Sequence, residues 1–165
     1  MNVIMKFGGT SVQDAEAMSR VISIVRRQWS DHPGSLPPVV VVSAMSKVTD
    51  RLVETGRLAA ERQGDQAAQI LADLLARHLG VTQTLVQGPA LEALNAQVTA
   101  DFQALIEDVR RWAADGEVTP AAADALQAIG ELASSRIVAA AFRQQGVDAA
   151  WVDSRQVLVT DAEHS

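Results

Sequence analysis

The 165-residue chain contains no cysteine, which excludes disulfide bonds, thiolate zinc sites and a cysteine nucleophile. The same absence fits a reducing compartment, so we expect the protein in the cytoplasm. No apolar run approaches the roughly 20 residues that a membrane helix requires. The first residues lack the basic start and long apolar region of a signal peptide. We therefore expect no membrane partner.

Positive charge is also scarce. Lysine and arginine number 14 against 20 acidic residues, giving a formal net charge of -6, whereas a nucleic-acid surface normally shows a basic stripe. We therefore expect no nucleic-acid partner. The three histidines, His32, His78 and His164, have no ligand spacing among them, so we expect them to be solvated and predict no metal site.

The strands are predicted from short apolar runs. Residues 2–7 read as a first strand and residues 39–42 as a second. The second run is β-branched on both faces, which predicts a strand buried on both sides, as in a parallel sheet covered by helices. Two further apolar segments, 149–152 and 157–160, predict strands at the end of the chain.

The helices are predicted from apolar periodicity. A helix is expected over about 14–29, and a helical pattern follows over about 50–112, with breaks near residues 64, 80 and 88. Thr119 before a proline predicts the start of a last helix, and Gly146 predicts its end. Strands alternating with helices make this an α/β protein with a mostly parallel sheet, of a length that suits one domain.

Gly8 and Gly9 are the only adjacent glycines, and they directly follow the first predicted strand. Backbone N–H groups bared at a strand end before a helix make a ready anion site, and Lys6 adds a positive charge beside it. The pattern is neither a Walker A loop, which needs its lysine after the glycines, nor G-x-G-x-x-G. A plain turn is the alternative interpretation.

Small polar residues also follow the second predicted strand. Ser43, Ser46 and Thr49 lie in a loop directly after the apolar run. Ligands of open α/β sheets bind beyond the carboxyl ends of the strands, so both loops indicate one site. Helix capping by Thr49 or Asp50 is compatible with that interpretation.

Four motifs occur in an order and at spacings that closely resemble the aspartate kinases of the amino-acid-kinase family: KFGGTSV, SAMSKVTD, GELASS and VDSRQVLVTD. The resemblance covers nearly the whole chain. It implies a three-layer αβα sandwich with a mostly parallel sheet, the amino-acid-kinase (carbamate-kinase-like) fold, here incomplete. It also implies phosphoryl transfer from ATP, carried with Mg²⁺, to the β-carboxylate of L-aspartate. The product is 4-phospho-L-aspartate, in the first step of lysine, threonine and methionine biosynthesis.

The resemblance also implies roles for single residues. Lys6 would neutralise charge on the transferring phosphoryl group, while Gly8 and Gly9 would donate backbone N–H groups to the phosphates. Ser43 matches a loop position near the phosphates and the substrate.

Two further positions match residues that bind the amino acid. Thr49 matches the threonine that contacts it, and Glu131 matches the glutamate that recognises aspartate through its α-ammonium group. Taken without the resemblance, Glu131 reads as a surface glutamate on an amphipathic helix.

The kinase domain of this family is longer than the chain. Its adenine pocket, its later glycine-rich motif with arginine and aspartate, and its regulatory ACT domains have no counterpart here. We therefore interpret residues 1–165 as the amino-terminal, aspartate- and phosphate-binding portion of the catalytic domain, and expect no useful turnover by this chain alone. The full-length protein is expected to be a homo-oligomer. Another amino-acid kinase, of glutamate or acetylglutamate type, and a non-catalytic binding or assembly module remain alternatives.

Overall fold

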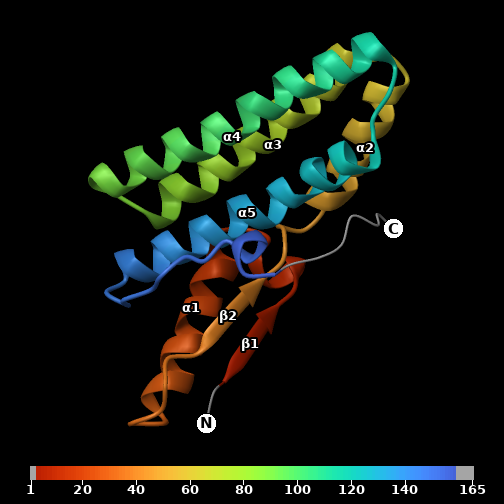
Figure 1. Ribbon diagram of the computed structural model, residues 1–165. Coiled ribbons are helices and arrows are strands. Elements are labelled where there is room, and N and C mark those ends of the chain that lie inside the picture. The colour runs from red at the N-terminus through yellow and green to blue at the C-terminus, as the bar shows by residue number, and fades with distance from the viewer. Residues whose placement is uncertain (1–2, 159–165) are drawn as a thin grey trace.

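A computed structural model describes residues 3–158 of the chain (Figure 1). Strands β1 (Ile4–Phe7) and β2 (Val39–Val42) pair in parallel, with Lys6 opposite Val41. The other elements, in chain order, are η1 (Gly9–Val12), α1 (Ala15–Ser30), α2 (Val48–Ala60), α3 (Gly64–Leu85), α4 (Gly88–Asp115), α5 (Pro120–Gln144) and η2 (Ser154–Gln156). The predicted α/β class with a parallel sheet is confirmed. None of the helices in residues 3–158 is both long and apolar enough to cross a membrane.

Local signals place the helix ends correctly. The Asp14 side chain accepts a hydrogen bond from the Ala17 N–H at 2.8 Å, which caps α1. Thr119 caps α5 in the same way through the Ala122 N–H at 3.2 Å. Gly146 follows α5 with a φ of 77°, the left-handed conformation that glycine adopts without strain. The predicted start of α1 near residue 14 and both predicted ends of α5 are confirmed, because each depends on groups only a few residues apart.

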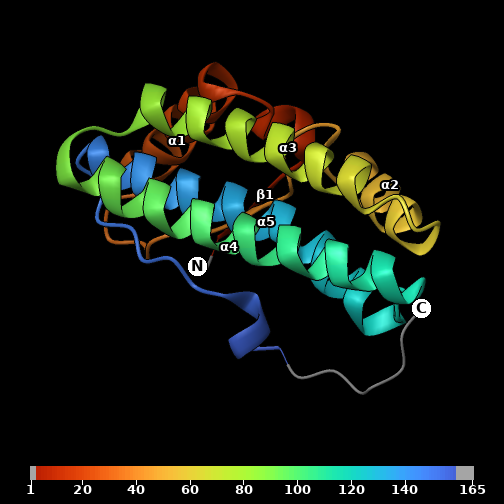
Figure 2. The same ribbon diagram turned by 90° about the horizontal axis from the view of Figure 1, so that it is seen from above.

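The predicted break at Gly80 is wrong, whereas the breaks near residues 64 and 88 correspond to the starts of α3 and α4. Gly80 lies inside α3, where a Cβ would meet no atom within 4 Å. A glycine in an exposed helix costs only about 1 kcal/mol relative to alanine, and packing of α3 along α4 offsets it. The two helices lie side by side (Figures 1 and 2), and the Thr82 hydroxyl donates to Asn95 Oδ1 at 2.5 Å between them.

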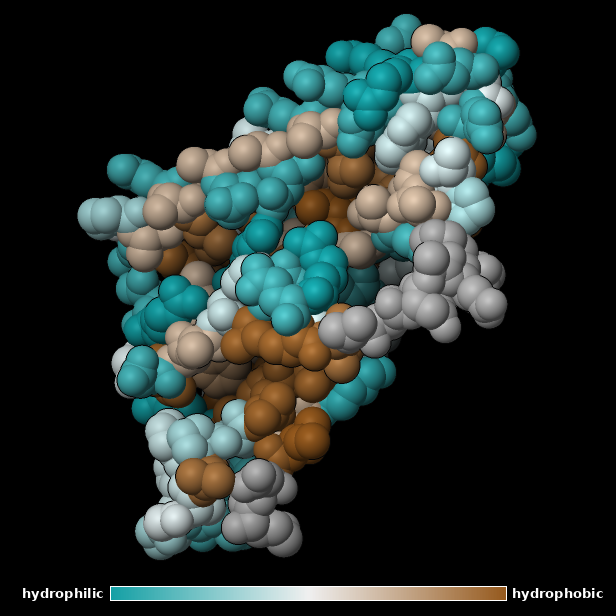
Figure 3. Space-filling view, viewed as in Figure 1, coloured by the Kyte–Doolittle hydropathy of each residue, from teal (hydrophilic) through white to brown (hydrophobic). Residues whose placement is uncertain are grey.

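The predicted burial of Val39–Val42 on both faces is wrong. Val39 and Val41 are 57% and 45% exposed, and Ile4 beside them on β1 is 71% exposed. Only the alternate residues of each strand pack against the core, because the described helices cover one face of the sheet. The other face forms an apolar patch over the two strands (Figure 3).

The segment 149–152 is not a strand, contrary to prediction. It contacts α5 through side chains instead of pairing with a strand. The Trp151 indole N–H donates to Ser135 Oγ at 2.9 Å, and the Arg136 guanidinium lies 4.6 Å from the Trp151 ring centroid. In the second segment, 157–160, the first two residues form no strand and the last two lie outside the described residues.

Candidate functional site

The loops that follow β1 and β2 meet at the carboxyl end of the sheet. The Ser43 N–H donates to the Phe7 carbonyl at 3.1 Å, and the Ser46 N–H donates to the Gly9 carbonyl, also at 3.1 Å. A Cβ at Gly9 would lie 2.9 Å from the Ala44 carbonyl oxygen. Position 9 therefore requires glycine because the second loop lies directly against it.

Gly8 is a glycine for which the fold itself gives no reason. A Cβ there would meet no atom within 4 Å, and its φ of -77° and ψ of 173° suit any residue. Neither packing nor backbone strain demands glycine at this position. The space over the Gly8 backbone, at the end of β1, is open to a ligand that approaches the main chain.

Lys6 lies on β1, two residues before the glycine pair. Its side chain is exposed, on the sheet face that the described helices leave uncovered. Among residues 3–158 it makes no hydrogen bond or ion pair. Within the described residues, no acidic side chain pairs with its ammonium, which lies close to the end of the strand.

Helix α5 packs tightly against the loop after β2. A Cβ at Gly130 would lie 2.8 Å from the Ala44 Cβ, so the helix can approach this closely only with glycine there. One turn further on, the buried Ser134 hydroxyl donates to the Ser43 carbonyl at 2.8 Å. Glu131 lies between these two contacts with its side chain exposed. The packing brings Glu131 to the same end of the sheet as the two loops.

Thr49 lies in the first turn of α2 with its side chain exposed. Its neighbour Val48 packs against Gly130, because a Cβ on that glycine would lie 3.1 Å from Val48 Cγ1. The expectation that Thr49 or Asp50 caps this helix is wrong. The N-cap position is Lys47, with a φ of 69° and no capping side chain, and its ammonium pairs with Asp50 at 3.3 Å.

The structure thus gathers five of the predicted residues around the carboxyl end of the sheet, on two loops and two helices: Gly8, Gly9, Ser43, Thr49 and Glu131. Lys6 belongs to the same end of β1. The roles assigned to all six stay predictions.

The sequence interpretation missed Arg77, on α3. Its guanidinium donates to the Ser46 carbonyl at 2.8 Å and to the Gln13 carbonyl at 2.9 Å. An arginine within a helical pattern carries no sequence signal of such contacts, because its partners are 31 and 64 residues away.

His78, next to Arg77 on α3, is fully buried, contrary to the expectation that the histidines are solvated. Its Nδ1 lies 2.7 Å from the Leu74 carbonyl and donates to it, while Nε2 has no hydrogen-bond partner among residues 3–158. Burial lowers the pKa of His78, the positive charge of Arg77 lowers it further, and the Leu74 hydrogen bond opposes both. The imidazole is therefore neutral and belongs to the core.

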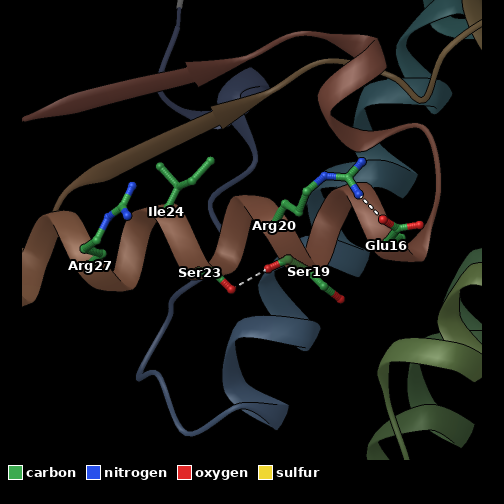
Figure 4. A pocket seen from close by; sticks show the side chains of 6 residues that line it. All are labelled: Glu16, Ser19, Arg20, Ser23, Ile24 and Arg27. Carbon is green, nitrogen blue, oxygen red and sulfur yellow. Dashed lines mark hydrogen bonds and ion pairs between the residues drawn. The ribbon is translucent and has the colours of Figure 1, made fainter.

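A surface hollow along α1 is separate from this region (Figure 4). It is lined by six residues of that one helix: Glu16, Ser19, Arg20, Ser23, Ile24 and Arg27. Two contacts within the lining are the pairing of Arg20 with Glu16 and the Ser23 hydroxyl bond to the Ser19 carbonyl. It contains none of the predicted residues and brings no second element into the lining. In the described part of the chain, no group of three or more His, Asp or Glu residues could hold a metal ion.

Comparison with known proteins decides the family. The model of the amino acid kinase family matches residues 1–165. The chain belongs to this family. The chain is 33% identical over 156 residues to the chloroplastic bifunctional aspartokinase/homoserine dehydrogenase 1 of Arabidopsis thaliana, which covers 94% of this chain and 16% of that relative.

Two solved structures of E. coli aspartokinase III share the fold of this family member. The complex with lysine and aspartate (T-state) superimposes with a TM-score of 0.72 at 25% identity, over 88% of this chain and 30% of that one. The complex with aspartate and ADP (R-state) superimposes with a TM-score of 0.64 at 27% identity. That match covers 95% of this chain and 32% of the aspartokinase chain. The predicted amino-acid-kinase fold is confirmed. The chain spans less than a third of the length of either solved structure, and a smaller share of the plant enzyme.

Proposed function

We propose that this chain is the amino-terminal, aspartate- and phosphate-binding part of an aspartate kinase, which transfers the γ-phosphoryl group of ATP to the β-carboxylate of L-aspartate. The observation that carries the proposal is the arrangement at the end of β1, formed by Lys6, Gly8, Gly9 and the loop after β2, which we call the phosphate cradle. There, the space over Gly8 is open and the two loops are joined at Gly9, beside Lys6, whose charge has no partner among residues 3–158. The similarity to aspartokinases supports this reaction over others of the family.

The proposed reaction requires the protein mainly to position the two substrates and to neutralise negative charge. A carboxylate is already ionised near neutral pH, so the acceptor needs no general base. Phosphoryl transfer then depends on holding donor and acceptor in line and on neutralising the oxygens of the transferring group. Lys6 supplies the positive charge, and the N–H groups of Gly8 and Gly9 supply donors. Mg²⁺ comes with ATP, since it usually binds through phosphates and few carboxylates.

Aspartate recognition falls to residues on the two helices that pack against the second loop. Glu131 offers a carboxylate for the α-ammonium group of the substrate, and Thr49 offers a hydroxyl. Ser43, on the loop after β2, would lie near both the phosphates and the substrate. A homo-oligomeric full-length protein and a cytoplasmic location are further parts of the proposal.

Calorimetric titration of the 165-residue chain with MgATP and with L-aspartate tests the proposal. Gly8→Ala is the sharpest variant, because a Cβ at this position fits the fold and should disturb only a ligand that approaches the backbone. We expect it to weaken MgATP binding at least about tenfold, the loss of roughly one charge-assisted hydrogen bond, and to leave aspartate binding unchanged.

Glu131→Gln is the complementary variant and should weaken aspartate binding while MgATP binding persists. L-Glutamate and N-acetylglutamate serve as competing ligands, and tighter binding of either would favour a kinase for that acid. If the wild-type chain binds neither MgATP nor aspartate, the kinase proposal is refuted for this chain and a non-catalytic module takes its place.

A further inference from the structure

Within residues 3–158, Arg77 is the one residue of α3 whose side chain donates hydrogen bonds to both the loop after β1 and the loop after β2. Nη1 donates to the Ser46 carbonyl at 2.8 Å, and Nη2 donates to the Gln13 carbonyl at 2.9 Å. Gln13 closes the loop after β1, and Ser46 lies in the loop after β2. A single planar group therefore joins two segments that are more than 30 residues apart in the chain.

The Gln13 and Ser46 carbonyls occupy equivalent positions, each one residue before the N-cap of a helix. Gln13 directly precedes Asp14, the N-cap of α1, and Ser46 directly precedes Lys47, the N-cap of α2. The guanidinium thus fixes the points at which both loops turn into their helices. A second link, the main-chain bond from Ser46 to the Gly9 carbonyl, joins the same loops closer to the strands.

We propose that Arg77 is a positioning residue that locks the two loops to each other and thereby holds the phosphate cradle in its binding geometry. The lock is a property of the fold. Its effect on phosphate binding rests on the proposed function, because phosphate binding by the two loops is itself part of that proposal.

The chemistry of the link requires arginine. A guanidinium presents several N–H donors in a rigid planar fork, so it can satisfy two carbonyls from different segments at once. A lysine ammonium is a compact charge on a flexible stem and keeps the charge without the fork. If Arg77 acted only by attracting anionic phosphates, lysine would replace it well.

Arg62 is a matched control in the same chain. Its guanidinium also donates to two main-chain carbonyls of a distant segment, those of Ala114 at 2.6 Å and Asp115 at 3.0 Å. It follows the far end of α2, which at 1.5 Å per residue lies about 20 Å from the loops. Loss of this second fork should leave the cradle unchanged.

The experiment compares the wild-type chain with Arg77→Met, Arg77→Lys and Arg62→Met. Amide hydrogen exchange is read for residues 8–14 and 43–48, and affinity is measured for magnesium tripolyphosphate, which imitates the phosphate tail of ATP. We expect Arg77→Met to speed exchange in both loops by about tenfold, and Arg62→Met to speed it only around residues 114–117. Arg77→Lys should resemble Arg77→Met, and both should weaken tripolyphosphate binding at equal global stability.

Unchanged exchange in the two loops of Arg77→Met would overturn the lock whether or not a phosphate binds. Recovery of affinity in Arg77→Lys would show that charge, and not the fork, is responsible, and would also overturn it. If loop exchange rises but tripolyphosphate affinity stays at the wild-type value, the positioning role is wrong. A wild-type chain that fails to bind tripolyphosphate would count against the proposed function, while exchange alone would still decide the lock.

Discussion

Mild acidification should lower the stability of this protein, and replacing His78 with leucine should abolish most of that loss. The imidazole is fully buried with Nε2 unpartnered, and burial lowers its pKa below the ordinary value of 6.5. In the unfolded chain the same group takes up a proton near its ordinary pKa. The unfolded state then binds more protons than the folded state, so stability falls as pH falls and is fully present above the unfolded pKa.

The size of the loss follows from proton linkage. Below the ordinary pKa, a proton that the unfolded chain binds and the folded chain does not lowers the free energy of unfolding by up to about 1.4 kcal/mol per pH unit. In the leucine variant this contribution is absent. At about pH 8 the variant should lie within about 1 kcal/mol of wild type, since the lost Leu74 hydrogen bond is offset by removal of an unsatisfied nitrogen.

Urea unfolding at a series of pH values, followed by circular dichroism, measures this difference. His32→Gln is the control, because His32 is exposed at the end of α1 and its replacement should leave the acid dependence in place. Parallel stability curves for wild type and His78→Leu between about pH 7.5 and pH 5.5 would refute the reasoning. That outcome would mean that the folded protein accepts the proton as readily as the unfolded chain does.

Three further substitutions test the contacts around the loops and helix ends. Gly9→Ala should destabilise the fold by about 1–3 kcal/mol through the contact with the neighbouring loop, while Gly8→Ala should not; equal melting temperatures for the two would contradict the geometry. Ser134→Ala should cost about 1–3 kcal/mol in urea unfolding, because the Ser43 carbonyl loses its partner, and a loss below about 0.5 kcal/mol would argue against that bond. Thr119→Ala should cost about 1 kcal/mol by loss of the α5 cap, and unchanged helicity and melting temperature would count against the cap.

The sequence predicted correctly what short-range chemistry decides. Asp14, Thr119 and Gly146 mark helix ends because a side-chain oxygen or a left-handed φ acts within a few residues. Gly9 is a different case, because the close approach that requires glycine there comes from the loop after β2, which is distant in the sequence. Gly80 was misread as a break because an exposed glycine can stay within a helix that is held by its neighbours.

What depends on distant parts of the chain was not predictable in the same way. Whether Val39 and Val41 are buried depends on which elements cover that face of the sheet. Whether 149–152 forms a strand depends on a neighbouring strand with free backbone groups to pair with. Arg77 was missed because its partners lie on other loops. The sequence did indicate which loops would meet at the carboxyl end of the sheet, while the roles of Lys6, Thr49 and Glu131 there stay predictions.

The bare face of β1 and β2 has a consequence for the behaviour of this chain in concentrated solution. Branched aliphatic side chains at Ile4, Val39 and Val41 are kept in contact with water by the same strands that carry the cradle. Sulfate and similar excluded salts raise the free energy of that hydration, so they should lower solubility through the sheet well before they affect the helices. The salting-out threshold of the chain should thus depend on these three outward-facing side chains more than on the long helices α3 and α4.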